Sequence, residues 1–155
     1  MLRTFEPKVL KRLILPIILK SKNMELQEAI NYVKTFHESF GINNENSPKM
    51  DVGESVIKLR HSLMHEENEE YLEAAEAGDL VEVADALGDM LYILCGTILA
   101  HGLQHKIEEV FTEIQRSNMS KLGADGKPIY REDGKVMKGE NYFKPNIKEV
   151  LEGRK

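Results

Sequence analysis

The stretch HEENEEYLEAAEAGDLVEVADALGDMLYILCGTILAHG, residues 65–102, decides the fold of this chain. Apolar residues recur at helical spacing on both sides of Gly78 and Asp79, and glycine followed by aspartate is typical of the end of one helix and the cap of the next. Helices joined by so short a connection pack as antiparallel neighbours. The stretch therefore predicts a helical hairpin whose arms span residues 52–77 and 79–101.

Further elements are expected on either side of this hairpin. Residues 24–40 and 104–120 each place apolar side chains at helical spacing, which predicts two more helices. The asparagine-rich stretch 42–53 is expected to be a loop that can move over whatever site the helices build. Residues 124–143 hold two Asp-Gly pairs between short β-prone pieces, and this pattern predicts a small hairpin that turns at Asp133 and Gly134.

The fold class that these elements predict is all-α: an antiparallel four-helix bundle-like core with a short C-terminal β-hairpin, completed by oligomerisation. With 155 residues, of which 41% are hydrophobic, the chain holds one domain. We assign that helical domain to residues 24–155. Residues 1–23 are interpreted as a basic N-terminal extension, either an arm that packs on a partner subunit or an expression artefact.

Charge is distributed unevenly along the chain. The net charge of −5 argues against a nucleic-acid partner, since such a protein needs a basic surface. It divides into +5 over residues 1–23, −14 over residues 24–115 and +4 over residues 116–155. The single cysteine, Cys95, is interpreted as a buried hydrophobe; it excludes an internal disulfide and fits a cytoplasmic protein. The apolar run 90–100 is too short to span a membrane, so no membrane partner is expected.

Acidic residues fall on the inward side of the first arm of the hairpin. At 100° per residue, Glu67 and Glu70 share the apolar stripe of this helix, and Glu66 lies at its edge. The other acids of this arm lie further round the helix and are interpreted as a solvated face: Glu69, Glu73 and Glu76. His61 and His65, at i and i+4, lie opposite the stripe and are interpreted as surface residues rather than zinc ligands.

The second arm repeats this pattern. Glu82, Asp85 and Asp89 share one stripe of a helix that is apolar on nearly every side over residues 90–100. A buried carboxylate without a partner is costly, and the sequence has no lysine or arginine between residues 61 and 105 to neutralise these groups. Oxygen ligands favour a hard cation, so the carboxylates predicted to bind Mg²⁺, with Mn²⁺ as an alternative, are Glu67, Glu70, Glu82 and Asp85. Asp89 either lines the site outside the ligand shell or bonds another helix.

The expected helix 104–120 also changes from apolar to polar along its inward stripe. Phe111 and Ile114 are followed on that face by Asn118 and Lys121. Two interpretations stay open. Either these two polar residues are the fraying end of the helix, with Lys121 near the helix dipole, or they reach the acidic site and contact phosphate oxygens that the metal holds.

The acidic motifs read E-x-x-E over residues 67–70 and E-x-x-D over residues 82–85, on consecutive helices. Together with N-x-x-K over residues 118–121, they resemble the all-α nucleoside triphosphate pyrophosphohydrolases, the MazG-like superfamily that includes dimeric dUTPases and phosphoribosyl-ATP pyrophosphohydrolase. The strings HEENEEYLEA, VEVADALGDMLYILCGTILAHG and SNMSKLGADGK look most like its stand-alone MazG-like members. The resemblance covers roughly residues 24–145.

The resemblance implies Mg²⁺-dependent cleavage between the α and β phosphates of a nucleoside triphosphate, which yields the monophosphate and pyrophosphate and serves the nucleotide pool. Carried over residue by residue, it makes the four carboxylates metal ligands that polarise the α-phosphate, and Glu66 the group that orients or deprotonates the attacking water. Asn118 and Lys121 would bind the polyphosphate, with help from the loop 42–53 or from Arg60. Members of the superfamily are homo-oligomers, so a homodimer or a dimer of dimers is expected.

Two alternatives are kept beside this hypothesis. The first is the same chemistry on phosphoribosyl-ATP. The second is a non-catalytic helical protein whose acidic helices dock on a basic partner and whose metal is structural; such an association would weaken with salt.

Overall fold

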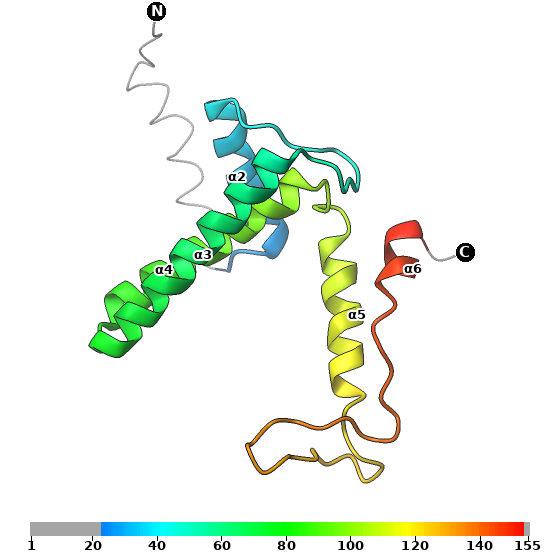
Figure 1. Ribbon diagram of the computed structural model, residues 1–155. Helices are drawn as coiled ribbons and strands as arrows, with labels where there is room; N and C mark the ends of the chain where they lie inside the picture. The colour runs from blue at the N-terminus through cyan, green and yellow to red at the C-terminus, as the bar shows by residue number, and fades with distance from the viewer. Residues whose placement is uncertain (1–22, 154–155) are drawn as a thin grey trace, which may run out of the picture.

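A computed structural model describes residues 23–153, which form five α-helices (Figure 1). The helices span Leu26–Phe40 (α2), Glu54–Ala77 (α3), Leu80–Ala100 (α4), Ile107–Met119 (α5) and Ile147–Glu152 (α6). This part of the chain contains helices and turns without a β-strand, so the all-α class is confirmed. The expected N-terminal extension lies, apart from Asn23, outside the described residues.

The α3/α4 hairpin has nearly the boundaries that its sequence predicts. Gly78 ends α3 in the left-handed conformation, with φ at +71°, and its N–H donates to the carbonyl of Ala75. The Asp79 carboxylate caps α4 by accepting the N–H groups of Val81 and Glu82 at 2.9 and 3.2 Å. Because these two residues complete the reversal, the long helices run antiparallel and side by side (Figure 1).

The core lies where α2 packs on the C-terminal half of α4. Its fully buried residues, each 5% exposed or less, are Ile30 and Val33 of α2 and Cys95, Ile98 and Leu99 of α4. The predicted burial of Cys95 is confirmed, and burial raises the pKa of its thiol. By length and composition alone, α4 is the one helix within residues 23–153 that is apolar enough to cross a membrane. It packs against both α2 and α3, and its buried residues lie mainly in its C-terminal half.

The loop between α2 and α3 is bonded to the end of α4. The N–H of Glu45 donates to the carbonyl of Leu99 and the N–H of Lys49 to that of His101, both at 3.0 Å. The buried Gln104 donates its Nε2 to the carbonyl of Glu45 at 2.9 Å. These bonds fasten residues 45–49 beside the C-terminal end of α4, and the movement of the loop over a site stays a prediction.

The expected four-helix bundle does not form within the described part of one chain. Helices α2, α3 and α4 pack together, whereas α5 leaves them and packs against α6 as a separate arm (Figure 1). The buried Glu113 of α5 accepts hydrogen bonds from Arg116 at 3.0 Å and from the backbone N–H of Asn146 at 2.8 Å. Asn146 also caps α6 by accepting the N–H of Glu149 at 3.3 Å. These contacts hold the C-terminal segment along α5, and the sequence pattern does not foresee this helix.

The expected C-terminal hairpin is reduced to a tight turn. Residues 129–137 close on a single antiparallel bridge, Tyr130 with Val136, around a turn at Asp133 and Gly134. Both bridge residues are exposed. With little apolar surface to bury, the pairing does not extend into strands, since an isolated two-stranded hairpin is marginally stable in water.

Gly96 permits a close contact among α2, α3 and α4. A methyl group at this position would overlap the guanidinium of Arg60 and lie 3.0 Å from Nε2 of His37. Arg60 is held there by two hydrogen bonds to α4. Its Nε donates to the Thr97 hydroxyl at 3.2 Å, and its Nη2 donates to the Ile93 carbonyl at 2.8 Å. An added methyl group at this point therefore requires the Arg60 guanidinium to move.

We expect Gly96→Ala to lower the stability of the protein by about 1–3 kcal/mol, because Arg60 must give up charge-assisted hydrogen bonds. Gly88→Ala is the matched control on the same helix, where a methyl group meets nothing within 4 Å. That control should be neutral or stabilising, by up to about 1 kcal/mol, since alanine is the better helix former. Thermal unfolding followed by circular dichroism measures both variants, and equal shifts in Tm would contradict the packing role of Gly96.

Candidate active site

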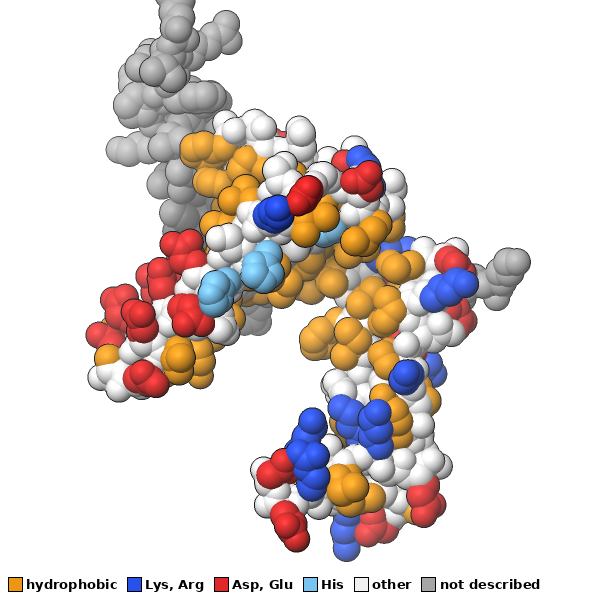
Figure 2. All heavy atoms as spheres, in the orientation of Figure 1, with side chains coloured by type: hydrophobic (Ala, Val, Ile, Leu, Met, Phe, Trp, Pro, Cys, Tyr) orange, Lys and Arg blue, Asp and Glu red, His pale blue; other side chains and the backbone are white. Residues whose placement is uncertain are grey.

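The antiparallel hairpin brings the two acidic motifs opposite one another near its tip. Glu70 of α3 and Glu82 and Asp85 of α4 line one cleft of about 440 Å³. Ala74 and Ala86 are buried at this level, so small side chains form the contact between the helices while the carboxylates flank it. Figure 2 shows Asp and Glu side chains gathered over this end of the hairpin. Three of the four predicted metal ligands therefore share one cleft.

Glu67, the fourth predicted ligand, lines a neighbouring cleft together with Asp89. Its Oε2 is shielded from solvent and has no hydrogen-bond partner. Burial, followed by the negative charges of Glu70 and Asp89, raises the pKa of Glu67 above that of an ordinary glutamate. A shielded carboxylate oxygen without a donor is an arrangement that a bound cation would relieve.

The acidic residues of the two motifs are less buried than their position on the helical stripe predicts. Glu67 is half-buried, whereas Glu66, Glu70, Glu82 and Asp85 are exposed. Across residues 23–153, no three His, Cys, Asp or Glu side chains lie close enough together to hold a metal ion. The reason is the position of the core: α2 covers the other end of the hairpin, and the tip that carries most of these acids stays open to solvent.

The cleft that Glu67 and Asp89 share is otherwise largely apolar. It has a volume of about 480 Å³ and lies among α2, α3 and α4. Its apolar lining consists of Val33, Phe36, Ile42, Val56, Leu59, Leu63, Tyr92, Ile93 and Ala100. The helical pattern marks most of these residues as core, so periodicity gives no sign that they surround a cavity.

Two polar side chains in this cleft are fixed by the fold. His37 is 2% exposed, and its Nδ1 lies 2.6 Å from the Oδ1 of Asn44. Arg60 is half-buried, which lowers the pKa of its guanidinium, and its bonds go to α4 rather than to a carboxylate. The structure thus places Arg60 where it ties α3 to α4. In the sequence, the feature that could have indicated His37 and Arg60 is Gly96, a glycine inside an apolar helix.

Asn118 and Lys121 lie at the end of α5, away from the carboxylates of the same chain. The Nζ of Lys121 donates to the Oδ1 of Asn118 at 2.7 Å, so the pair forms one polar unit. Figure 1 shows α5 diverging from the α3/α4 hairpin, and Figure 2 shows Lys and Arg side chains gathered on the arm that follows it. Within one chain, the structure therefore does not bring these two residues to the acidic motifs.

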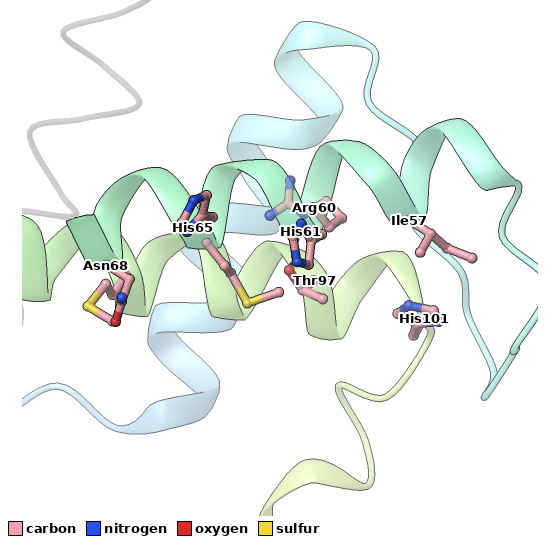
Figure 3. A pocket seen from close by; sticks show the side chains of 9 residues that line it. Ile57, Arg60, His61, His65, Asn68, Thr97 and His101 are labelled. Atoms are coloured by element: carbon pink, nitrogen blue, oxygen red, sulfur yellow. Dashed lines mark hydrogen bonds between the residues drawn. The ribbon is translucent and has the colours of Figure 1, made fainter. Parts of the chain in front are cut away.

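A groove of about 460 Å³ follows the α3/α4 hairpin and carries three histidines. Figure 3 shows His61 and His65 on α3 and His101 at the end of α4. The rings of His61 and His65 are 6.4 Å apart between centroids, and both side chains are exposed. Nδ1 of His101 lies 3.0 Å from the carbonyl of Lys49. The interpretation of His61 and His65 as surface residues is confirmed, and none of the acidic site residues lines this groove.

Comparison with known proteins shows the family of this chain. A family model described as phosphoribosyl-ATP pyrophosphohydrolase matches residues 33–118, a segment that includes the whole α3/α4 hairpin and ends at Asn118. Among solved structures, the chain is similar to the crystal structure of "a putative NTP pyrophosphohydrolase" from Exiguobacterium sp. 255-15. The two are 25% identical with a TM-score of 0.43, over 82% of this chain and 92% of that chain. No curated protein matches the sequence.

We expect Glu67→Gln to stabilise the metal-free protein at neutral pH. The raised pKa of Glu67 means that, between its ordinary and its raised value, the folded chain holds a proton that the unfolded chain has released. Stability from this group is therefore present at low pH and is lost as pH rises through the raised pKa. The difference in Tm between the variant and the natural protein should grow with pH from 4 to 8 in the presence of EDTA.

Glu76→Gln provides the control, since Glu76 is exposed on the same helix. Its difference in Tm from the natural protein should stay flat over the same pH range. A flat difference for Glu67→Gln as well would mean that the Glu67 carboxylate carries no penalty in the fold.

Proposed function

We propose that this chain, which belongs to the phosphoribosyl-ATP pyrophosphohydrolase family, is a Mg²⁺-dependent enzyme that hydrolyses the α–β phosphate bond of a nucleoside triphosphate. The family makes the chain a hydrolase of pyrophosphate bonds, and the metal and the nucleoside triphosphate are our additions. Both additions are supported by the two carboxylate motifs, which oppose one another across the α3/α4 hairpin. In one of these motifs, Glu67 Oε2 has no hydrogen-bond partner. The products would be the nucleoside monophosphate and pyrophosphate.

The residues that would hold the metal are Glu67, Glu70, Glu82 and Asp85. Carboxylate oxygens fit a hard divalent cation, and a cation beside Glu67 would supply the missing partner of Oε2. When bound, Mg²⁺ polarises a phosphoryl oxygen and offsets the charge of the phosphate group. Without it, the carboxylates would repel a polyphosphate, so we expect substrate binding at this cleft to depend on the metal.

Glu66 is our candidate for the residue that prepares the attacking water. It is exposed next to Glu67 and belongs to the acids whose charge raises the pKa of Glu67. A carboxylate in that position can accept a proton from water as the water oxygen attacks the α-phosphorus. The bond from the α-phosphorus to the bridging oxygen then breaks, and pyrophosphate leaves.

We also propose that the enzyme is a homodimer or a larger homo-oligomer. On α4, four leucines on one side are 43–79% exposed: Leu80, Leu87, Leu91 and Leu94. On α5, Phe111 is 66% exposed. Exposed apolar residues gathered on one side of a helix mark interaction surfaces. Because Asn118 and Lys121 lie on the arm, a second copy would have to bring them to phosphates held at the carboxylates.

Phosphoribosyl-ATP is a second candidate substrate, and the description of the matched family favours it. It carries the same triphosphate group, so the same carboxylates and metal would serve both reactions. A panel of substrates separates the two.

With Mg²⁺ and a panel of NTPs, dNTPs and phosphoribosyl-ATP, we expect release of monophosphate and pyrophosphate from at least one member. Chromatography resolves the products, and EDTA should stop the reaction. Turnover of no member, or release of a single phosphate, would contradict the proposed reaction. Binding of a basic protein that weakens with salt, without any hydrolysis, would favour the non-catalytic alternative.

Glu70→Gln and Asp85→Asn should each lower kcat/KM by at least about 100-fold. Mutating a residue that only hydrogen-bonds a metal ligand already lowers metal affinity or activity by roughly 10–100-fold. Both should also remove any rise in Tm that Mg²⁺ causes, because a ligand stabilises the state that binds it. Glu76→Gln should retain activity and the Mg²⁺-dependent rise. Full activity in Glu70→Gln or Asp85→Asn would refute the metal-binding role of these residues.

For the oligomer, we expect Leu87→Glu to dissociate the protein, because a charge in the middle of the leucine row cannot be buried cheaply. Sedimentation velocity measures the mass of both forms. The control is Met50→Glu, an equally apolar but isolated position that is 80% exposed in the loop before α3, and it should keep the natural mass. A natural protein that sediments as a monomer would refute the proposal.

A further inference from the structure

The groove that follows the α3/α4 hairpin holds nitrogen and sulfur ligands that the proposed hydrolysis does not use. His61 and His65 contribute imidazoles, and Met64 and Met90 contribute thioethers, to the lining of one space of about 460 Å³. None of the carboxylates assigned to Mg²⁺ lines this groove. Imidazole and thioether groups are ligands of transition metals rather than of Mg²⁺, so the groove is a candidate for a second and different metal site.

The two histidines have a spacing that allows both to bind one ion. His61 and His65 lie one turn apart on α3, and both rings line the same groove (Figure 3). Their ring centroids are 6.4 Å apart. Histidines at i and i+4 on one helical face can coordinate the same metal ion. Both side chains are exposed, so their rotation can bring one nitrogen of each ring to that ion.

Glu69 favours one nitrogen of His65 as the ligand. Nδ1 of His65 lies 3.8 Å from Oε1 of Glu69, which follows it by one turn of α3. A carboxylate that faces one nitrogen of an imidazole orients the ring and leaves the other nitrogen for the metal. His65 would therefore bind through Nε2, with Glu69 outside the ligand shell.

The ligand set favours copper(I) over zinc. Zinc sites are built almost entirely from Cys, His and carboxylate ligands, and they hold at least three of them. Over the described range 23–153, no three such side chains lie close enough together to hold one ion, so neither His101 nor Glu69 completes a zinc site here. Thioethers, in contrast, are soft ligands that select Cu(I), and imidazole also suits copper.

The methionines can reach an ion that the histidines hold. Met64 lies on α3 and Met90 across the groove on α4, and both side chains are half-buried in its lining. Methionine is unbranched and has three rotatable side-chain bonds, so it adapts easily to a ligand. An ion bound by both helices would join them near the middle of the hairpin.

The electrostatic surroundings of the groove allow a cation. Arg60 also lines it, but its guanidinium is held against α4 by hydrogen bonds to Thr97 and to the carbonyl of Ile93. Residues 24–115 carry a net charge of −14, and an excess of negative charge raises the local concentration of cations.

We propose that this groove binds one copper(I) ion through His61 and His65, with Met64 and Met90 as sulfur ligands. The site is independent of the proposed hydrolysis, because it uses none of the residues assigned to Mg²⁺, water or phosphate. Copper binding can therefore be measured whether or not the protein hydrolyses a nucleotide.

Copper(I) alone is the probe. We expect the full-length protein to bind one Cu(I) per chain in anaerobic equilibrium dialysis with ascorbate and acetonitrile, with copper measured by atomic emission. His61→Ala and His65→Ala should each weaken binding by at least about tenfold, since loss of a ligand costs no less than loss of its orienting partner. Met90→Leu, which keeps the apolar volume, should weaken it as well. Zn²⁺ in tenfold excess should leave the copper bound.

Three variants serve as controls and should keep their copper. His105→Ala removes an exposed histidine that does not line the groove. Cys95→Ala removes a thiol that is 1% exposed, and Asp85→Asn changes the proposed Mg²⁺ site. Circular dichroism confirms that each variant is folded, and X-ray absorption of the natural protein should show scattering from imidazole. Binding of no copper, full binding in His61→Ala, or displacement by Zn²⁺ would overturn the inference.

Discussion

The concentration of negative charge on the α3/α4 hairpin is the constraint on which the rest of the structure depends. Residues 24–115 carry a net charge of −14, and the stretch 61–105 holds no lysine or arginine. Carboxylates cannot be buried together without a counter-charge, so the helices cannot be enclosed along their whole length. The protein places its core at one end, where α2 covers Cys95 and Leu99, and leaves the acidic tip in solvent. The hydrophobic core and the candidate site thus lie at opposite ends of the same two helices.

The sequence predicts those parts of the fold that depend on contacts between residues close together in the chain. The reversal between α3 and α4 depends on one left-handed glycine and one capping aspartate, and both act within a few residues. The direction in which α5 leaves depends instead on contacts far apart in sequence, such as Glu113 with Asn146. The loop before α3 is fastened by bonds between residues 45 and 104. Helical periodicity contains no information about such pairs. It therefore predicts a bundle that the described part of the chain does not form, and it does not predict where the loop is fastened.

The candidate site divides in the same way. The spacing of Glu67, Glu70, Glu82 and Asp85 follows from helix geometry, so three of them share one cleft and Glu67 turns inward beside it. Periodicity assigns inward and outward faces but cannot say how far a partner helix extends along them. It therefore overestimates the burial of Glu70 and Asp85. The approach of Arg60 and His37 to Gly96 needs three helices to be placed at once, and only the folded chain reveals it.

The basic residues of the C-terminal arm, which consists of α5, α6 and the segment between them, lie apart from the acids of the hairpin (Figure 1). Residues 116–155 carry a net charge of +4, enough to pair with several of the hairpin acids if the arm lay on its own hairpin. Glu113, Arg116 and Asn146 instead hold the arm together as a unit of its own, with Lys121 bonded to Asn118. Direct ion pairs would satisfy the carboxylates permanently and compete with any cation. Because the arm lies apart, its basic residues do not neutralise the hairpin acids of the same chain, and the cation that we propose would supply that positive charge (Figure 1).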